Sequence, residues 1–328
     1  PEALQARYAV SLSVSERVPA AAESAASTPA PAAVRPAPDR LQWTPVTVPW
    51  PGAVAFDLTL NSFDGATAVG RIVYPSDTAA APAGRPWPVM VALHGQGRTH
   101  LRWWQHELRG RPTIENTHRV TALALQQGFV VVALDARGHG VRQGDGPVPS
   151  QLLENLHTWG QREPYERMIV DTVRDYRMLL DVLASRPELN TASVAAAGYS
   201  MGGQIALLLA GVDARVGAVA ALVPPHLDQR TAAVAPINVV GSLQGRRVWL
   251  VTADSDEYAS AKDNAALFGA LPGDPRNRHV RLPGGHLLPE GYVDQLAPWL
   301  QATAADLGSL PQVPVPQAST SGPAAPSP

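Results

Sequence analysis

The sequence predicts an α/β fold with a mostly parallel central sheet, helices on both of its faces and antiparallel strands where the domain begins. Continuous apolar runs at 89–93 and 129–134 are typical of strands that are buried on both faces. Amphipathic segments follow these runs, as expected when strands alternate with helices. An Asp64-Gly65 hairpin signal separates two earlier strands, 55–60 and 66–74. The sheet should therefore start antiparallel and continue parallel.

The later elements repeat this alternation. The longest helix is predicted at 163–186, where Pro164 suits the first turn and apolar residues recur along one face. Further strands are expected at 192–197, 216–223, 248–252 and 279–282, and further helices at 114–127, 204–210 and 292–304. Parallel sheets of this kind place their functional residues at the carboxyl ends of the strands.

The two ends of the chain differ from the middle in composition. Residues 1–42 are rich in Ala, Pro and Ser and are expected to form a flexible arm, although 7–14 alternates enough for an isolated strand. Residues 311–328 have the same character and are expected to form a flexible tail. Neither a repeat nor a composition break divides the remainder, so 43–310 is predicted to be one domain.

Composition limits the partners and the location. The net charge of -2 and the pI near 6.6 give no basic footprint for nucleic acid, and no apolar run is long enough for a membrane span. A small-molecule or polymer-linked substrate is expected. The chain has no cysteine and begins at Pro1, so we expect a processed, exported protein, with a cytoplasmic location as the alternative. The oligomeric state does not follow from the sequence.

The segment Gly198-Tyr199-Ser200-Met201-Gly202-Gly203 joins a predicted strand to a predicted helix. A serine at such a corner, with glycine two residues before and after it, has the pattern of a nucleophile elbow. The turn is so tight that a side chain at 198 or 202 should collide with the neighbouring strand or helix. Ser200 is therefore the candidate nucleophile.

A serine nucleophile needs a base and a carboxylate that orients the base. His286 is the candidate base because it lies in a glycine-rich loop directly after the last strand. Asp256 is the candidate carboxylate, with Asp254 as the alternative, since both follow the strand at 248–252. Glu257 is expected to begin the next helix. The order Ser, Asp, His agrees with an elbow architecture.

Two backbone N–H groups are candidates for an oxyanion hole. Met201 offers the first because it lies at the amino end of a helix. Gln96 offers the second, with Gly97 as the alternative, because His94-Gly95-Gln96-Gly97 follows the strand at 89–93. His94 and His139 are predicted to brace their turns by hydrogen bonds, and the remaining histidines to be solvated or packed.

The sequence also bears on substrate binding. Only residues 224–247 separate two consecutive strands, which leaves no room for a large helical lid at that point. The loop at 141–162 is the predicted cover of the site. Trp103, Trp104 and Trp159 are candidate substrate-binding residues, with buried packing as the alternative for the first two.

Two cofactor interpretations fail on spacing. Gly138-His139-Gly140 lacks the third glycine of a dinucleotide motif, since Gln143 occupies that place. His100 and His106 are six residues apart and have no partner at a helical ligand spacing. No cofactor and no metal are therefore predicted.

Five motifs together resemble the α/β-hydrolase superfamily, and the resemblance covers residues 88–300. They are His94 to Gly97, Asp135 to Gly140, Gly198 to Gly203, Ala253 to Asp256 and Gly284 to Leu287. The long helix, with Val170 to Arg174 and its end at Leu183 to Pro187, is similar to the dienelactone-hydrolase-like and acetyl-esterase-like branch. Enzymes of the dienelactone type carry cysteine at the elbow, whereas this chain carries Ser200.

The resemblance implies a serine hydrolase that cleaves carboxylic esters through an acyl-enzyme, and the serine at the elbow favours ordinary ester hydrolysis. A peptidase or amidase with the same triad is the nearest alternative. A non-catalytic binding protein of the same fold is the alternative from a different class.

Overall fold

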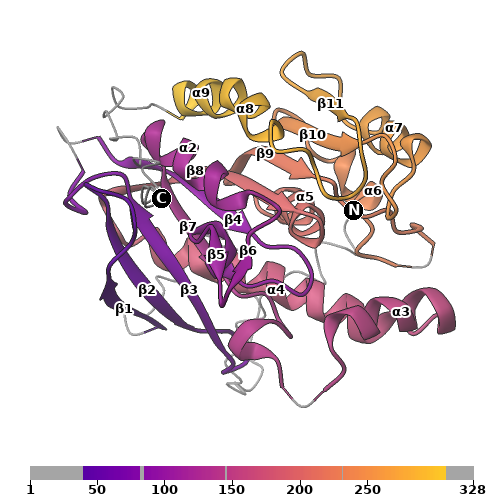
Figure 1. Ribbon diagram of the computed structural model, residues 1–328, viewed down its shortest axis with the longest axis horizontal. Coiled ribbons are helices and arrows are strands. Elements are labelled where there is room, and N and C mark those ends of the chain that lie inside the picture. Colours follow the sequence, from indigo (N-terminus) through magenta and orange to yellow (C-terminus); the bar gives the residue numbers. More distant parts are fainter. Residues whose placement is uncertain (1–39, 82–84, 145, 231, 308–328) are drawn as a thin grey trace, which may run out of the picture.

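The computed structural model describes residues 40–81, 85–144, 146–230 and 232–307 (Figure 1). The predicted tail, the possible strand at 7–14 and all of the predicted arm before residue 40 lie outside these ranges. The first strand begins at Leu41, so it includes two residues that the sequence analysis assigned to the arm.

A nine-stranded mixed sheet forms the centre of the molecule, in the order β1-β2-β3-β7-β4-β8-β9-β10-β11. The first three strands and β7 pair antiparallel, and each later neighbour pairs parallel. This arrangement confirms the predicted α/β-hydrolase fold with antiparallel entry strands. The strands are β1 Leu41–Val46, β2 Val54–Asn61, β3 Thr67–Tyr74, β4 Trp87–Leu93, β7 Val130–Leu134, β8 Leu189–Tyr199, β9 Val216–Leu222, β10 Arg247–Ala253 and β11 Arg278–Leu282.

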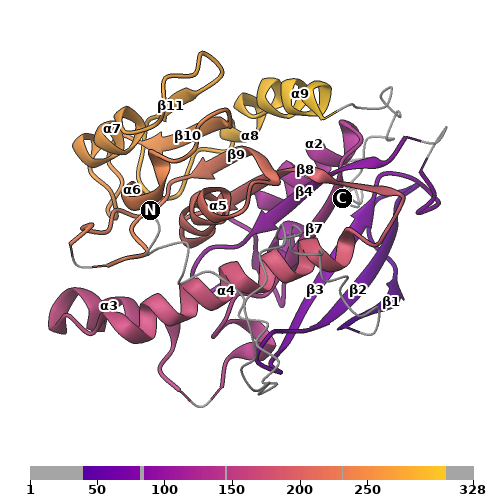
Figure 2. The ribbon, with the colours of Figure 1, turned by 180° about the vertical axis from the view of Figure 1, so that it is seen from behind.

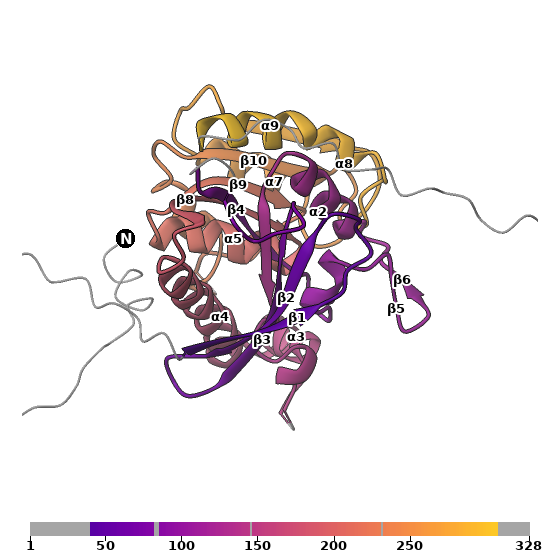
Figure 3. The ribbon, with the colours of Figure 1, turned by 90° about the vertical axis from the view of Figure 1, so that its left-hand side faces the viewer.

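Helices cover both faces of the sheet, as Figures 2 and 3 show from two further sides. Alternate strand residues feed two separate apolar cores: Val89 and Val91 belong to one, and Met90 and Ala92 to the other. The first core lies under α3 Pro149–Trp159, α4 Arg162–Leu183, α5 Met201–Val212, α6 Ile237–Val240 and α7 Ala261–Gly269. The second lies under α2 Thr117–Gln126, α8 Tyr292–Gln295 and α9 Ala297–Asp306.

The predicted hairpin at Asp64-Gly65 joins β2 to β3. Gly65 has φ +82°, a conformation that glycine adopts without strain, and the N–H of Ala66 donates to the Asp64 carboxylate at 3.1 Å. The hairpin therefore forms where the sequence predicts it.

Several elements differ from the prediction. The expected single helix at 292–304 is two helices, α8 and α9, because Pro298 lacks an N–H and suits the first turn of a new helix. Half of the predicted loop at 141–162 is helical, because α3 spans Pro149–Trp159. Two short segments, η3 His100–Trp103 and the hairpin β5 Glu107–Leu108 with β6 Arg111–Pro112, have no counterpart in the prediction. A 3₁₀ turn, η4, spans Gly140–Arg142.

The six mutually parallel strands β7, β4, β8, β9, β10 and β11 end at one edge of the sheet. Ser200 follows β8, and the loops after β10 and β11 carry Asp256 and His286. Residues that are distant in the sequence are brought together at this edge.

Candidate active site

Ser200 lies at the corner between β8 and α5, with φ 55° and ψ −120°. A non-glycine residue with positive φ is strained by about 1–3 kcal/mol. A Cβ on Gly198 would lie 2.0 Å from the Gly202 carbonyl oxygen, and one on Gly202 would lie 2.0 Å from that of Leu93. The predicted collisions with the helix and with a neighbouring strand are therefore confirmed. The two glycines allow the chain to present Ser200 at the sheet edge.

A chain of hydrogen bonds joins Ser200, His286 and Asp256. His286 Nε2 lies 2.8 Å from Ser200 Oγ, and His286 Nδ1 lies 2.9 and 3.1 Å from the two carboxylate oxygens of Asp256. The Asp256 side chain is fully shielded from solvent. An ionised Asp256 accepts the Nδ1 proton, which leaves Nε2 free to accept the Ser200 hydroxyl proton.

Asp254, the alternative carboxylate, faces a different partner. Its Oδ1 accepts from Arg281 Nη2 at 2.6 Å and from Nε at 3.1 Å, and about half of the side chain is exposed. The structure thus brings Asp256, and not Asp254, to His286.

Two further residues hold the backbone of His286. The N–H of His286 donates to Glu257 Oε2 at 2.8 Å, and its carbonyl accepts from the Tyr199 hydroxyl at 2.9 Å. Hydrogen bonding from the His286 N–H lowers the pKa of Glu257. Glu257 does not begin a helix as predicted, because the capping box of Ser260 and Asp263 starts α7 at Ala261.

Sequence reasoning missed both of these supporting residues. Tyr199 occupies the unspecified position of the elbow motif, and Glu257 reads as one of three acidic residues in a loop. A possible signal was the presence of a hydroxyl and a carboxylate next to Ser200 and Asp256. No pattern in the sequence shows that they reach residue 286.

The candidate oxyanion donors lie beside Ser200. Met201 is the first residue of α5, so its N–H has no acceptor within the helix. Gln96 lies in the turn after β4, and Gly95 is so close that a Cβ there would be 3.5 Å from Ser200 Cβ. Gln96 and Met201 both line the cavity at Ser200, whereas Gly97 lines a neighbouring cleft.

The cavity at Ser200 has a volume of about 470 Å³. Its wall combines apolar and charged residues. The apolar ones include Ile114, Leu153, Pro225 and Leu287, and the charged ones are Arg98, Glu115 and Glu257. An acyl or alcohol group of moderate size fits such a space.

The three candidate substrate-binding tryptophans do not line this cavity, which corrects the prediction. Trp103 and Trp104 are fully buried in the second apolar core, where Trp104 packs edge-on against Trp50 with ring centroids 6.2 Å apart. Trp159 is 72% exposed at the end of α3. Leu153 of the same helix does line the cavity, so the segment at 141–162 contributes to the site through a different residue.

The turns after β4 and β7 are braced by buried histidines, as predicted. His94 Nδ1 donates to the Gly95 carbonyl at 2.8 Å, and its Nε2 accepts the N–H of Ala136 at 2.9 Å. Burial lowers the pKa of His94 to about 3, so the ring stays neutral. His139 Nδ1 donates to the carbonyl of Arg137 at 2.8 Å.

Asp135 pairs with His100 beneath the same turns. Its Oδ1 lies 2.7 Å from His100 Nδ1 and accepts the backbone N–H of His100 at 2.8 Å. Burial raises the pKa of Asp135, but the hydrogen bonds from His100, together with the neighbouring histidines, lower it overall. The pair joins the end of β7 to η3.

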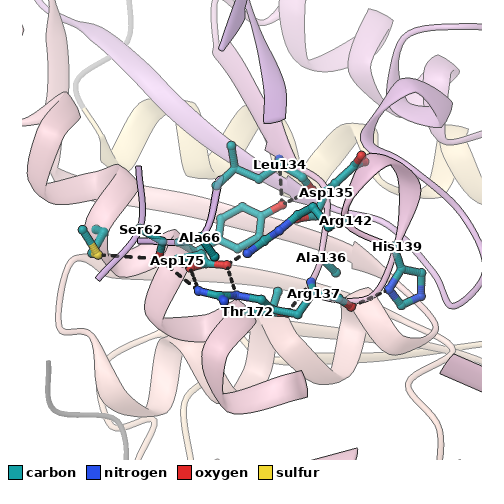
Figure 4. Close-up of polar contacts among 12 residues, drawn as sticks. Ser62, Ala66, Leu134, Asp135, Ala136, Arg137, His139, Arg142, Thr172 and Asp175 are labelled. Atoms are coloured by element: carbon teal, nitrogen blue, oxygen red, sulfur yellow. Dashed lines mark hydrogen bonds and ion pairs between the residues drawn. The ribbon is translucent and has the colours of Figure 1, made fainter. Parts of the chain in front are cut away.

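A buried ion network, drawn in Figure 4, supports the turn after β7 from below. Asp175 of α4 is 1% exposed and accepts from Arg137 at 2.7 and 2.8 Å and from Arg142 at 2.7 Å. It also accepts the Ser62 hydroxyl, and Arg137 extends to Asp64 at 2.7 Å. The network ties the β2–β3 hairpin, the turn after β7 and α4 together.

The part of the chain that the structure describes holds no cluster of three or more His, Cys, Asp or Glu side chains that could bind a metal ion. Within the same residues, no helix is both long enough and apolar enough to cross a membrane.

Comparisons with known proteins show which family and which folds this chain is similar to. The model of the dienelactone hydrolase family matches residues 104–263, a range that includes Ser200 and Asp256. No match was found among curated protein sequences.

Three of the similar solved structures represent the fold. A cold-adapted esterase from an Arctic intertidal metagenomic library, bound to PEG, is 17% identical with a TM-score of 0.55, over 78% of this chain and 98% of that one. An acetyl xylan esterase from Paenibacillus sp. R4 is 17% identical with a TM-score of 0.56, over 80% and 88%. Est1E from Butyrivibrio proteoclasticus, bound to ferulic acid, is 14% identical with a TM-score of 0.51, over 74% and 96%. The chain therefore has the α/β-hydrolase fold, and over residues 104–263 it is similar to the dienelactone hydrolase family.

Proposed function

We propose that the protein is a serine hydrolase of carboxylic esters. The observation that carries this proposal is the hydrogen-bonded chain from Asp256 through His286 to Ser200, which ends in a cavity of about 470 Å³. The family match is consistent with hydrolysis, and two of the similar proteins, those from the Arctic metagenomic library and from Paenibacillus sp. R4, are named esterases. Serine at the elbow is consistent with ester cleavage.

In this mechanism Ser200 Oγ attacks the acyl carbon while its proton passes to His286 Nε2. The imidazolium that forms keeps its Nδ1 proton in a hydrogen bond to Asp256, whose buried negative charge stabilises it. The negative oxygen of the tetrahedral intermediate accepts hydrogen bonds from the N–H groups of Gln96 and Met201.

The intermediate collapses when the bond from the acyl carbon to the alcohol oxygen breaks and His286 protonates the departing alcohol. A water molecule then attacks the acyl-enzyme, with His286 Nε2 accepting its proton. The second tetrahedral intermediate releases the carboxylic acid and returns the proton to Ser200. None of these steps requires a metal ion or a cofactor.

The test is hydrolysis of an aryl acetate by the wild type and by Ser200→Ala. Loss of the nucleophile should lower kcat by about a thousandfold or more. Ser242→Ala is the matched control, because this hydroxyl donates to the Val239 carbonyl outside the site. Turnover by Ser200→Ala at the wild-type rate would refute the proposal. A matched anilide, cleaved faster than the ester, would instead identify an amidase.

A further inference from the structure

A second cavity, which we call the arginine cleft, adjoins the cavity at Ser200. It has a volume of about 860 Å³, and Gln96 and Arg98 line both spaces. The cleft is bounded by the turn after β4, η3, the β5–β6 hairpin and the start of α3. A substrate bound at Ser200 can therefore extend into it past Gln96.

Four arginines line the cleft, namely Arg98, Arg102, Arg109 and Arg111. Arg98 is paired with Glu115. Arg102 donates to two neutral groups, the Arg111 carbonyl at 2.8 Å and the Thr113 hydroxyl at 3.1 Å. Burial lowers the pKa of Arg102, the nearby charge of Glu115 raises it, and the charges of Arg98 and Arg111 lower it again. The cations are thus close enough to repel one another.

Arg109 and Arg111 are exposed on the β5–β6 hairpin, which projects from the body of the molecule in Figure 3. The two residues of its tight turn, Arg109 and Gly110, have φ 53° and 72°. Asn, Asp and Gly are the residues that such a turn favours, since positive φ costs other side chains about 1–2 kcal/mol. An arginine at this position is unfavourable for the turn itself, which suggests that its side chain has a role in the cleft.

Apart from Glu115, which pairs with Arg98, the described residues around the cleft add no unpaired carboxylate to its lining. The acidic residue among them is Asp135, which is buried and already paired with His100. Within the described part of the chain, no Trp, Tyr or Phe side chain lines the cleft, whereas proteins that bind single-stranded nucleic acid stack its bases on such rings. The net charge of -2 for the whole chain conceals this local excess of arginine.

We propose that the arginine cleft binds a polyanionic substrate, an oligomer with repeated carboxylates, whose ester is cleaved at Ser200. The guanidinium fork pairs with a carboxylate through two parallel hydrogen bonds, and several arginines along one cleft suit repeated carboxylates. O-acetylated oligogalacturonate, whose hydroxyl groups carry esters near repeated carboxylates, is a probe of this class. This inference rests on the proposed ester hydrolysis and specifies its substrate class.

The test compares O-acetylated oligogalacturonate with the carboxyl-reduced form of the same oligosaccharide, which keeps the linkages and removes the charges. The wild type should show a kcat/KM ratio that favours the acidic substrate by about threefold to tenfold at low ionic strength. Added salt should reduce the ratio, because salt screens exposed charges. The variant Arg109→Gln with Arg111→Gln should bring the ratio close to one.

Arg85→Gln with Arg167→Gln is the matched control, since both residues are exposed and outside the cleft. It removes the same charge and should keep the ratio. A wild type that hydrolyses an aryl acetate but shows a ratio of one would overturn the substrate class and leave the esterase proposal intact.

Binding gives a readout that does not depend on turnover. Ser200→Ala should bind unesterified oligogalacturonate more tightly than does Ser200→Ala with Arg109→Gln and Arg111→Gln. This comparison tests the cleft independently of catalysis. If the wild type hydrolyses no aryl acetate, the esterase proposal is overturned, and the binding comparison still decides whether the cleft recognises carboxylates. Tighter binding of single-stranded DNA of equal charge would overturn the inference in favour of a nucleic acid.

Discussion

The hydroxyl of Tyr199 donates to the backbone carbonyl of His286 at 2.9 Å and accepts the N–H of Leu288 at 2.9 Å. Tyr199, which immediately precedes the proposed nucleophile, thus holds the loop of the proposed base at His286 and at Leu288. Burial raises the pKa of Tyr199, so the hydroxyl remains a neutral donor. The elbow and the histidine loop are coupled by this one side chain.

Replacing Tyr199 with phenylalanine should lower kcat more than it changes KM. The variant loses the hydrogen bonds to His286 and Leu288, which fix the loop that carries His286, and each such bond contributes about 1 kcal/mol. We expect kcat to fall by about fivefold if the loss of one bond affects the rate and by about thirtyfold if the loss of both does. Steady-state kinetics with an aryl acetate measures the change.

Tyr165→Phe is the control for this prediction. Its buried hydroxyl donates to Gln204 at 2.8 Å and does not contact His286. It should lower the melting temperature and leave kcat near the wild-type value. Equal losses of kcat in the two variants would show that Tyr199 acts only through stability.

Glu257 should support His286 through its ability to accept a hydrogen bond. Glu257→Gln keeps an acceptor for the His286 N–H and should retain kcat, whereas Glu257→Ala should lower kcat by about twofold to fivefold, as an exposed contact does. Asp254→Ala, which removes the partner of Arg281, is the control. A loss of kcat in Glu257→Gln that matches Glu257→Ala would assign the effect to charge.

The stability of the fold should decrease in acid because of His94. The folded pKa is about 3, and the unfolded pKa is about 6.5, so the unfolded state takes up a proton first as the pH falls. The contribution is complete above about pH 6.5 and declines below it by about 1.4 kcal/mol per pH unit. Chemical unfolding between pH 8 and pH 4 measures this slope.

His94→Gln can keep both hydrogen bonds without titrating, so its slope should be smaller by about the contribution of one histidine. The control is His157→Gln on the exposed side of α3, which should keep the wild-type slope. Parallel slopes for the wild type and His94→Gln would contradict this account.

The Asp175 network should be costly to break. Asp175→Asn leaves Arg137 and Arg142 without their shared buried anion, and a broken buried ion pair costs about 3–5 kcal/mol. Urea unfolding should show this loss. Glu163→Gln breaks an exposed pair with Arg167 on the same helix and should cost less than about 1 kcal/mol. Similar midpoints for the two variants would exclude an energetic role for the network.

The sequence predicts what depends on local patterns. Apolar runs identify the buried strands. The glycines around Ser200 identify the corner, because a Cβ at either of these positions would collide with the backbone and glycine is therefore required. The order of the motifs along the chain also predicts which strand ends meet, since parallel strands end at one edge.

Features set by long-range packing could not be predicted in this way. Trp103 and Trp104 have the same local pattern whether they line a cavity or fill a core, and only the position of Trp50 and the strands decides. Glu257 contacts a residue 29 positions away.

The break at Pro298 was visible in the sequence, because proline favours the first turn of a new helix.

The central claim is that Ser200 is a nucleophile activated by His286. The most direct measurement is intact-mass and peptide analysis after reaction with a serine-directed phosphonate. The account predicts one adduct per chain, located on Ser200, absent from Ser200→Ala and formed far more slowly in His286→Ala. A folded wild type that forms no adduct, or forms it on another residue, would contradict the claim.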